Sequence, residues 1–507
     1  MNFVKVDSAA VVGIEAQHVE IDVDAMRSEQ GMITIVGLPD LAIKESKQRV
    51  TSAIRHSGFS FDSIQATINL APANLKKEGT VYDFPIALGL LESLKILPAG
   101  ILKDFVLAGE LGLSGELRPI LGALSIALLA KKLKKKGLIL PLANTQEAAM
   151  IDGIEIYGVR HLKDAIKFLL NKGSLAPVTG CIEFQQEPSL IDFADIKGQA
   201  NVKRALEIAA SGGHNVLMNG PPGSGKTLAA KALPTIFPLM ELEEILEVTK
   251  IYSAAGLIPA GQNLMTSRPF RSPHHSISYA GMIGGGTSPK PGEVTLAHYG
   301  VLFLDELPEF TRQTLEVLRQ PLEDHKVTIS RAKQHITFPT QFLLVAAMNP
   351  CPCGYLGHPD KVCKDTGLQI ERYQKKISGP LLDRIDLHVS VAPLRFKDLG
   401  SSLKEESSLM IQKRVSLARE KQKQRFLINK TNSLMTPQET LEAVPLNQNC
   451  HSLLKQAVDQ MGVTARGYHR LLKVARTIAD LEGSSSVNDT HILEALSYRP
   501  LNDSQNN

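Results

Sequence analysis

Eight residues, GPPGSGKT at positions 220–227, constrain this chain more than any other part of its sequence. They match the pattern G-x-x-x-x-G-K-[ST], follow an apolar stretch (HNVLMN, 214–219) and precede a helix-forming one (LAAKAL, 228–233). Glycines in such a loop let backbone N–H groups surround a phosphate, and the following helix N-terminus adds positive charge. The strand, loop and helix in this order therefore predict a P-loop nucleotide site.

The residues of this loop divide between two tasks. Lys226 is expected to reach the β- and γ-phosphate oxygens, and the hydroxyl of Thr227 is expected to ligate Mg²⁺. We therefore expect ATP and Mg²⁺ as cofactors. The candidate cofactor-binding residues are Gly220, Pro221, Pro222, Gly223, Ser224, Gly225, Lys226, Thr227 and Asp305.

Two apolar stretches downstream end in polar residues that suit hydrolysis. In GVLFLDE, at 300–306, Asp305 would hold Mg²⁺ and Glu306 would polarise the attacking water. In FLLVAAMNP, at 342–350, Asn349 could orient that water and sense the γ-phosphate. Together with the P-loop, these stretches predict a parallel, doubly wound sheet and a hydrolytic NTPase.

The rest of the chain suggests flanking domains. A length of 507 residues gives a starting expectation of about three domains. Short β-like runs at 19–24, 32–38 and 64–72 alternate with a helical stretch at 41–58, which is typical of an α/β domain. The residues TPQE, from Thr436, form a capping-box pattern that begins a helical region. The expected organisation is a first domain over 1–170, a linker over 171–190, an ATPase core over 191–395, a connector over 396–432 and a helical lid over 433–507.

Composition excludes several classes of protein. The 56 basic and 52 acidic residues give a net charge of +4, so the chain is no histone-like polycation and any nucleic-acid contact must be local. Aromatic residues are 5% with no Trp, which argues against a broad base-stacking platform. The longest apolar run, LGALSIALLA at 121–130, is half the ~20 residues of a membrane span, and no secretory signal pattern is visible. We expect a buried helix at 121–130 and a soluble, cytoplasmic protein with no membrane partner.

Three of the five cysteines crowd into the stretch CPCGYLGHPDKVCKD, at 351–365. Five cysteines are too few for a disulfide scaffold, so a reducing compartment is expected. Zn²⁺ takes four tetrahedral ligands, and Cys351, Cys353 and Cys363 could supply three of them. His358 or Asp365 could be the fourth, and Asp365 is the one we select. Three free thiols on a loop are the alternative.

Five longer segments carry a specific resemblance. They are RPFRSPHHSIS (268–278), GEVTLAHYGVLFLDELPEF (292–310), LRQPLEDHKVTISRA (318–332), AAMNPCPCGY (346–355) and SGPLLDRIDLHV (378–389). Together they resemble the competence protein ComM family, which is similar to the motor subunit of magnesium chelatase. The resemblance covers essentially the whole chain.

This resemblance implies an AAA+ ATPase that works as a homo-hexameric ring. It further implies a helicase that drives branch migration of recombination intermediates during natural transformation. The implied partners are branched or forked DNA, other copies of the chain and other recombination proteins.

The resemblance also identifies two arginines as candidate catalytic residues. Arg384, in LLDRID, matches the family's arginine finger, which reaches the γ-phosphate held by the neighbouring subunit. The alternative is a surface arginine paired with Asp383 or Asp386. Arg466, in TARGYHR, resembles the sensor-2 arginine of the helical lid, and Arg470 is the rival candidate.

The segment HKVTISRA, at 325–332, resembles a β-hairpin that related rings point into their pore. Its basic residues and those of the segment 268–278 are therefore candidate contacts to the DNA backbone. Ordinary surface or subunit-contact roles are the alternative. The candidates are Arg268, Arg271, His274, His275, Lys326, Arg331 and Lys333.

The first domain resembles the catalytic fold of Lon protease, through KKEGTVYDFPIAL (76–88) and GELGLSGELRPILGAL (109–124). In this alignment Val81 stands where the protease has its serine, and Leu124 stands where it has its lysine. A Ser–Lys dyad needs a hydroxyl and an amine, so we expect a proteolytically inactive platform. The expected fold class is α/β, with a Lon-protease-like (ribosomal S5 domain 2-like) α+β N-terminal domain, an AAA+ P-loop core and a C-terminal helical lid.

Two other functions are compatible with the same motifs. One is a chelatase-type motor that inserts Mg²⁺ into a porphyrin with partner subunits. The other is an ATP-gated regulator of a protein partner, without activity on DNA. DNA-stimulated turnover would distinguish the helicase from both.

Overall fold

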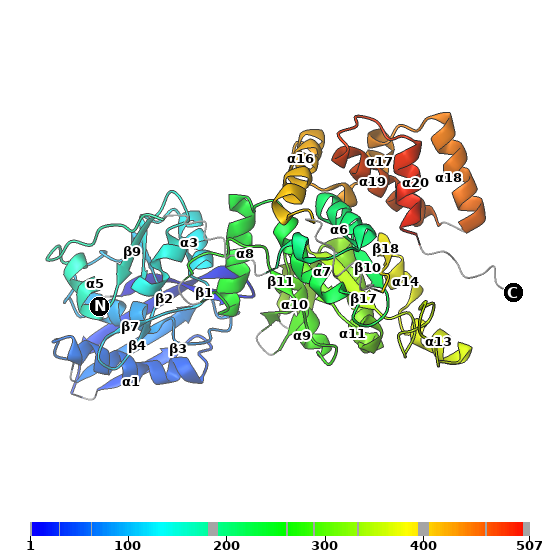
Figure 1. Cartoon of the computed structure of the whole chain (residues 1–507). Helices are drawn as coiled ribbons and strands as arrows, with labels where there is room; N and C mark the ends of the chain where they lie inside the picture. The colour runs from blue at the N-terminus through cyan, green and yellow to red at the C-terminus, as the bar shows by residue number, and fades with distance from the viewer. Residues whose placement is uncertain are drawn as a thin grey trace. The chain divides into compact units, whose positions relative to one another are not determined.

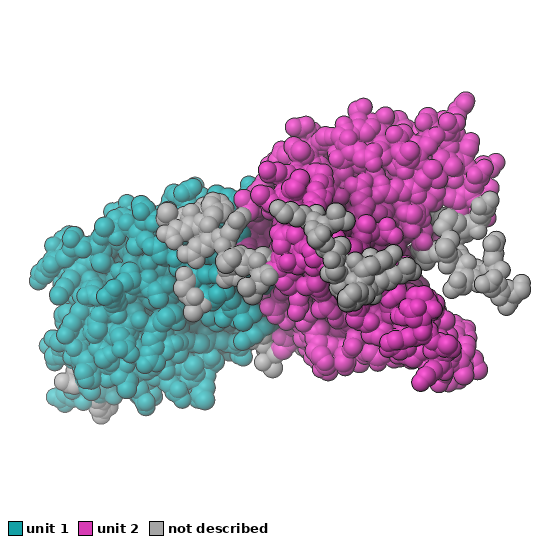
Figure 2. Space-filling view, in the orientation of Figure 1, with its two compact units in different colours: residues 1–185, 242–266, 287–290 teal, residues 186–241, 267–286, 291–507 magenta. Residues whose placement is uncertain are grey.

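A computed structural model describes residues 3–29, 31–61, 63–180, 191–259, 262–286, 289–331, 334–393, 405–461 and 464–499 (Figure 1). The chain forms two compact units (Figure 2). Unit 1 comprises residues 1–185, 242–266 and 287–290, and unit 2 comprises residues 186–241, 267–286 and 291–507.

Unit 1 is built on a seven-stranded sheet with the order β3-β4-β2-β1-β5-β8-β9. The long strand β2 alternates between buried and more exposed residues, so one of its faces packs on the core. The β1–β2 and β2–β4 pairs are antiparallel, whereas the remaining pairs of this sheet are parallel. The strands of this unit are β1 (Val4–Val12), β2 (Glu15–Arg27), β3 (Met32–Val36), β4 (Ile64–Ala71), β5 (Phe105–Leu107), β6 (Glu110–Leu111), β7 (Leu117–Arg118), β8 (Gly137–Pro141) and β9 (Glu155–Val159).

Helices cover this sheet. Every residue of the apolar helix α2 is buried, and its first residue, Asp83, pairs with the Arg49 guanidinium 2.7 Å away. Helix α3 is the buried helix expected at 121–130, with a basic end that reaches solvent. The helices of this unit are α1 (Leu41–His56), α2 (Asp83–Ser93), α3 (Ala123–Lys132), η1 (Leu142–Asn144), α4 (Thr145–Ala148), α5 (Leu162–Leu169) and α8 (Leu242–Ala255).

Unit 2 contains a five-stranded parallel sheet with the order β11-β14-β17-β10-β18. Strands β14 and β17 are buried along their whole length, which suits their unbroken apolar sequences VLFL and LLVAAM. The sheet strands are β10 (Val216–Asn219), β11 (Phe270–Arg271), β14 (Val301–Leu304), β17 (Leu343–Met348) and β18 (Leu387–Ser390). Two further sheets have two strands each. One pairs β12 (Gly284–Gly285) with β13 (Lys290–Pro291), and the other is the antiparallel pair of β15 (Lys326–Arg331) and β16 (Gln334–Pro339).

Helices α6, α7, α16, α18, α19 and α20 share one large apolar core with this sheet. The helices of unit 2 are η2 (Phe193–Asp195), α6 (Ala200–Gly212), α7 (Lys226–Ala232), η3 (Leu233–Ile236), α9 (Tyr279–Ile283), α10 (Glu293–Leu296), η4 (Leu307–Glu309), α11 (Arg312–Glu316), α12 (Arg319–Asp324), α13 (Gly367–Gln374), α14 (Gly379–Leu382), α16 (Ser408–Phe426), η5 (Asn432–Leu434), α17 (Pro437–Ala443), α18 (Gln448–Met461), α19 (Ala465–Leu481) and α20 (Asp489–Ser497).

The expected α/β fold class is confirmed, and so are the expected strands and helix of the first domain and the parallel sheet around the P-loop. The capping box at Thr436 is also present, because its hydroxyl accepts from the Glu439 N–H and the Glu439 carboxylate accepts from the Thr436 N–H. One difference concerns residues 242–266, which we expected in the ATPase core. These residues pack with unit 1, where α8 lies against α3.

None of the helices in the described ranges is long and apolar enough to cross a membrane.

Candidate functional site

The P-loop lies between β10 and α7. Gly223 and Gly225 have φ angles of 74° and 89°, and a Cβ at either position would meet no atom within 4 Å. These glycines are therefore required by the left-handed backbone and not by crowding. The loop turns back on itself, so that Lys226 Nζ donates to the carbonyl oxygens of Gly220 (2.7 Å) and Pro221 (2.8 Å).

The surroundings of the Lys226 ammonium group favour binding of an anion. The side chain is only 8% exposed, and burial lowers its pKa, which the nearby Asp305 carboxylate partly opposes. Nζ also donates to Oδ1 of Asn349, at 3.2 Å. Because its partners in the loop are neutral carbonyl and amide oxygens, phosphate oxygens would supply the negative charge that this buried cation lacks.

Thr227 and Asp305 form the second part of the site. Thr227 Oγ1 donates to Asp305 Oδ2 at 2.7 Å. Two cis ligands of an octahedral Mg²⁺ with bonds near 2.1 Å lie about 2.9 Å apart, so this pair of oxygens has nearly the spacing that the ion requires. The hydroxyl and carboxylate thus fit Mg²⁺ in both chemistry and separation.

Glu306 follows Asp305 and has an unusual backbone. Its φ is 51°, in the left-handed region that costs a non-glycine residue roughly 1–2 kcal/mol, and its N–H donates to Asp305 Oδ1 at 2.9 Å. Its side chain is exposed, with Oε2 3.6 Å from Nδ1 of His275. Local strain that the surroundings maintain is typical of functional sites.

These groups lie together because three strands end at one edge of the sheet. β10 leads into the P-loop, β14 leads into Asp305 and Glu306, and β17 leads into Asn349. Strand β17 lies between the other two. The carboxyl ends of parallel strands are the usual position of a ligand site in such sheets.

The two candidate arginines meet at a single carboxylate. Arg384 Nη2 pairs with Oε2 of Glu323, and Arg466 Nη2 pairs with Oε1 of the same residue. Arg384 Nη1 also donates to the Pro380 carbonyl at 2.7 Å, while its buried Nε has no partner among the described residues. The alternative reading, in which Arg384 pairs with Asp383 or Asp386, is therefore not the arrangement found. Burial alone would raise the pKa of Glu323, but the bonds and charges of Arg384 and Arg466 together outweigh it and the pKa is lowered.

Arg470, the rival of Arg466, has different surroundings. It is mostly buried, and its Nε lies 3.5 Å from Oδ1 of Asp386. The same aspartate also accepts from the Asn215 N–H and lies 3.5 Å from Nδ1 of His214. Arg470 is thus part of an internal network beside β10, whereas the Arg466 side chain is 46% exposed.

The basic residues of the segment 268–278 bond within unit 2. Arg268 donates to the carbonyl oxygens of Pro238 (2.9 Å) and Tyr299 (2.8 Å), and Arg271 makes two bonds to Glu293 (2.6 and 2.8 Å). Such bidentate and carbonyl contacts hold the segment against the sheet. His274, by contrast, is exposed and bonds only locally, to Ser276 at 2.8 Å. His275, expected among the DNA contacts, lies beside Glu306.

The expected β-hairpin is present as β15 and β16. Its residues alternate, with Val327, Ile329, Ile336 and Phe338 buried and Thr328 and Thr337 exposed. Lys326 is exposed at its base. Arg331 ends β15, but its side chain and the whole of Lys333 lie outside the described residues.

The cysteine-rich loop between β17 and α13 brings four candidate ligands together. The three sulfurs of Cys351, Cys353 and Cys363 lie 3.4, 3.6 and 3.6 Å apart. An oxygen of Asp365 joins them, and the four ligand atoms lie within 4.8 Å of one another. His358 is not part of this group, because its Nδ1 accepts backbone N–H bonds from the adjacent turn.

Unit 1 has apolar side chains at the two positions aligned with the protease dyad. Val81 is half-buried between two apolar clusters, and Leu124 is fully buried in α3. Neither can act as a nucleophile or a base, so the expectation of an inactive platform stands as a proposal.

Two contacts of this site could not be predicted from the sequence. Glu323 lies in the segment LRQPLEDHKVTISRA, which carries the family resemblance, but nothing there indicates that its carboxylate pairs with both arginines. His275 was expected only as a DNA contact, because nothing in the sequence indicates that its segment brings it to Glu306. Both contacts join residues far apart in the chain, which neither periodicity nor motif spacing can reveal.

Comparisons with known proteins agree with the geometry. Residues 192–399 match the family described as "Magnesium chelatase, subunit ChlI", residues 19–144 match "Subunit ChlI of Mg-chelatase", and residues 405–499 match "Magnesium chelatase, subunit ChlI C-terminal". The chain is 41% identical to competence protein ComM of Haemophilus influenzae over 99% of this chain and 98% of that protein. It is also 41% identical to a protein of Escherichia coli described as uncharacterized protein YifB, over 98% and 97% of the two chains.

A shorter similarity is to a protease. Lon protease 2 of Bacillus subtilis is 32% identical over 146 residues, which is 28% of this chain and 26% of that protein. The P-loop geometry, the three matched regions and the full-length relatives lead to one assignment. The chain belongs to the magnesium chelatase ChlI-like family of AAA+ ATPases, together with competence protein ComM.

Proposed function

We propose that the chain is a Mg²⁺-dependent ATPase that assembles into a hexameric ring in the cytoplasm and drives branch migration of DNA junctions. The observation that carries the ATPase part is the convergence of Lys226, Thr227, Asp305, Glu306 and Asn349 at three adjacent strand ends. The DNA part is supported by the hairpin β15–β16 and by the full-length similarity to a competence protein.

In this proposal the residues of the strand ends act together on ATP. Bound Mg²⁺ would neutralise phosphate charge, with Thr227 and Asp305 as its protein ligands. Lys226 holds the phosphate oxygens at the N-terminus of α7. Glu306 accepts a proton from the attacking water, and Asn349, anchored by Lys226 at 3.2 Å, orients that water.

Arg384 completes the site of a neighbouring subunit. Its partners within the chain are Glu323 and Pro380, not the P-loop, so it is available to act in trans once the Glu323 pair opens. A finger supplied by a neighbour makes hydrolysis dependent on ring assembly. Arg466, which shares Glu323, would report the nucleotide state to the helical lid.

The hairpin is the proposed contact to DNA. Its apolar face packs into unit 2, Lys326 is exposed at its base and Arg331 ends β15; Lys333 follows two residues later in the sequence. In a ring each basic residue occurs once per subunit, so a chain with a net charge of only +4 could still bind a phosphate backbone. Contacts of this kind grip DNA without reading its sequence.

The test combines hydrolysis with junction movement. Wild-type protein should hydrolyse ATP faster with four-way junction DNA than without it, and should separate the junction into its duplex products. Glu306→Gln should bind ATP and assemble but lose both activities, whereas Glu309→Gln, an exposed acid paired with Lys376, should retain them. Wild-type protein that neither binds junctions nor moves them would refute the DNA part, and porphyrin-linked turnover with partner subunits would favour a chelatase-type motor.

A further inference from the structure

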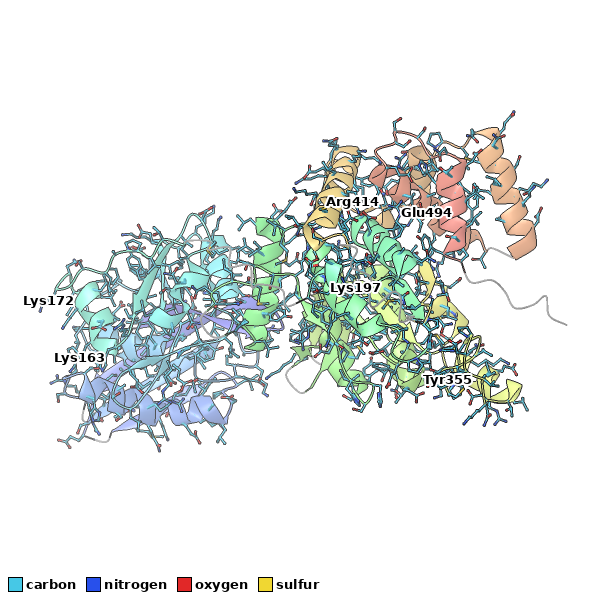
Figure 3. All side chains as sticks on the ribbon, in the orientation of Figure 1. Lys163, Lys172, Lys197, Tyr355, Arg414 and Glu494 are labelled. Carbon is cyan, nitrogen blue, oxygen red and sulfur yellow. The ribbon has the colours of Figure 1, made fainter. Side chains whose placement is uncertain are left out.

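The loop between β17 and α13 buries few apolar side chains that could stabilise its conformation. Tyr355 marks this loop in Figure 3, and residues 349–366 contain no helix or strand. Cys351 is fully buried, but Val362 is 86% exposed. A loop of this length without a core needs another source of order, and a metal ion commonly provides it.

We propose that Cys351, Cys353, Cys363 and Asp365 bind one zinc ion. Tetrahedral Zn²⁺ with Zn–S bonds near 2.3 Å has sulfur–sulfur edges of about 3.8 Å and sulfur–oxygen edges of about 3.5 Å. The three sulfur separations are 3.4, 3.6 and 3.6 Å, and Cys363 Sγ lies 3.8 Å from Asp365 Oδ2. These separations exceed the roughly 2.05 Å of a disulfide and lie close to the edge lengths of a zinc tetrahedron.

Backbone groups support the ligands in this arrangement. The Leu356 N–H donates to Cys351 Sγ at 3.3 Å, and the Cys353 N–H donates to Asp365 Oδ2 at 2.8 Å. Backbone bonds from Tyr355 and Lys364 reach Cys353. Hydrogen bonds of this kind fix the orientation of metal ligands and stabilise thiolates.

The donor set favours zinc and a structural role. Thiolates suit Zn²⁺, whereas Mg²⁺ and Ca²⁺ prefer oxygen ligands only. Four protein ligands also close the coordination sphere and leave no position for water or substrate. The ion would therefore order the loop and take no part in bond breaking.

The loop that the metal orders touches the nucleotide site. Gly354, one residue after Cys353, has a φ of 83°, and a Cβ there would lie 2.6 Å from Pro222 Cδ of the P-loop and 3.8 Å from Asn349 Cγ. Asn349 itself stands two residues before Cys351, and its backbone bonds to Tyr373. Zinc would thus fix the position of Asn349, a role that rests on the proposed ATPase function.

Metal content tests the site directly. The full-length protein, purified under reducing conditions and analysed by plasma mass spectrometry, should contain about one zinc ion per chain. Cys363→Ser should lose this zinc, and Asp365→Ala, which keeps the three thiolates, should bind it more weakly. His358→Ala, in the same loop, and Cys450→Ser, a buried cysteine elsewhere, should retain it. Wild-type protein without stoichiometric zinc, or zinc that survives Cys363→Ser, would overturn the proposal.

Cobalt provides a second readout that does not depend on folding yield. Wild-type protein reconstituted with Co²⁺ should show thiolate-to-metal charge-transfer bands and the visible spectrum of a tetrahedral site. Asp365→Ala should alter the visible bands while leaving the thiolate bands. Octahedral cobalt in the wild type would contradict the ligand set.

The positioning role is tested by removing zinc with a chelator and adding it back. We expect the hydrolysis rate to fall about tenfold and to return with Zn²⁺, while the affinity for a fluorescent ATP analogue changes little. An unchanged rate would overturn the positioning role while the zinc site stands. A wild type that holds zinc but hydrolyses no ATP would instead refute the proposed function.

Discussion

At the scale of single residues, Glu323 is the group whose importance the sequence hides. It lies near the end of α12, shortly before the hairpin begins at Lys326. Its two carboxylate oxygens pair with Arg384 and Arg466. The Arg384 side chain is only 10% exposed, so it depends on this carboxylate for neutralisation. The same pair must open before Arg384 can reach a neighbour's nucleotide.

Glu323→Gln should therefore destabilise unit 2. The substitution leaves the largely buried Arg384 guanidinium without its carboxylate. Because Glu323 itself is 44% exposed, we expect the free energy of unfolding to fall by about 1–2 kcal/mol. Urea denaturation followed by circular dichroism measures this. The neighbouring exposed acid, changed in Asp324→Asn, is the control and should lose less than about 0.5 kcal/mol. Equal losses in the two variants would contradict the role of Glu323.

His388, in β18 beside the P-loop strand, predicts an acid sensitivity. Burial, with a smaller effect of Arg499, lowers the pKa of His388 to about 4 from an ordinary value of 6.5. Between these values the unfolded chain binds a proton that the folded chain does not. The group therefore costs nothing above pH 6.5 and removes about 1.4 kcal/mol of stability per pH unit as the pH falls toward 4.

The measurement compares thermal unfolding of the wild type and His388→Gln from pH 7 to pH 4. The wild type should lose stability more steeply than the variant below pH 6.5, and the two slopes should agree above it. Parallel curves over the whole range would show that His388 is protonated equally in both states.

At the scale of elements, the sequence predicted most of what local patterns determine. The strands β14 and β17 follow from unbroken apolar runs, and α17 follows from the capping box at Thr436. The P-loop, Asp305 and Asn349 could be assigned because motif and strand end lie together in the chain. The packing of α8 in unit 1, and the pairing of Arg384 with Glu323, depend on contacts between distant segments and could not be assigned.

The hairpin β15–β16 carries the clearest prediction at this scale. Lys326→Ala should weaken binding to duplex and junction DNA alike, and should make the logarithm of affinity less steeply dependent on the logarithm of salt concentration. Fluorescence anisotropy across a salt series measures both. Lys375→Ala, an exposed lysine on the connection after α13, is the control and should change neither. An effect confined to one DNA sequence would argue against a backbone contact.

At the scale of the whole molecule, hydrolysis should be shared between subunits. Lys226→Ala lacks the phosphate-binding ammonium group, and Arg384→Ala lacks the finger, so each variant alone should lose at least about 10³-fold in rate. Mixed rings restore a complete site wherever an intact P-loop meets a neighbour's intact Arg384. Random mixing in equal amounts should then recover about a quarter of the sites.

Steady-state ATPase assays of the two variants, alone and mixed, measure this recovery. Size-exclusion chromatography with light scattering should first show that both variants assemble. If the mixture stays inactive although mixed rings form, Arg384 acts within its own subunit or not on ATP at all.

The division of the chain into units has a mechanical consequence. Unit 1 takes in residues 242–266 and 287–290 from the middle of the ATPase region, so the chain passes between the units at several points and not at one linker. A body attached by a single tether can swivel and transmits only tension. A body attached through several chain segments stays joined when one of them is cut, so cleavage at a single point between the units would not release unit 1 from unit 2.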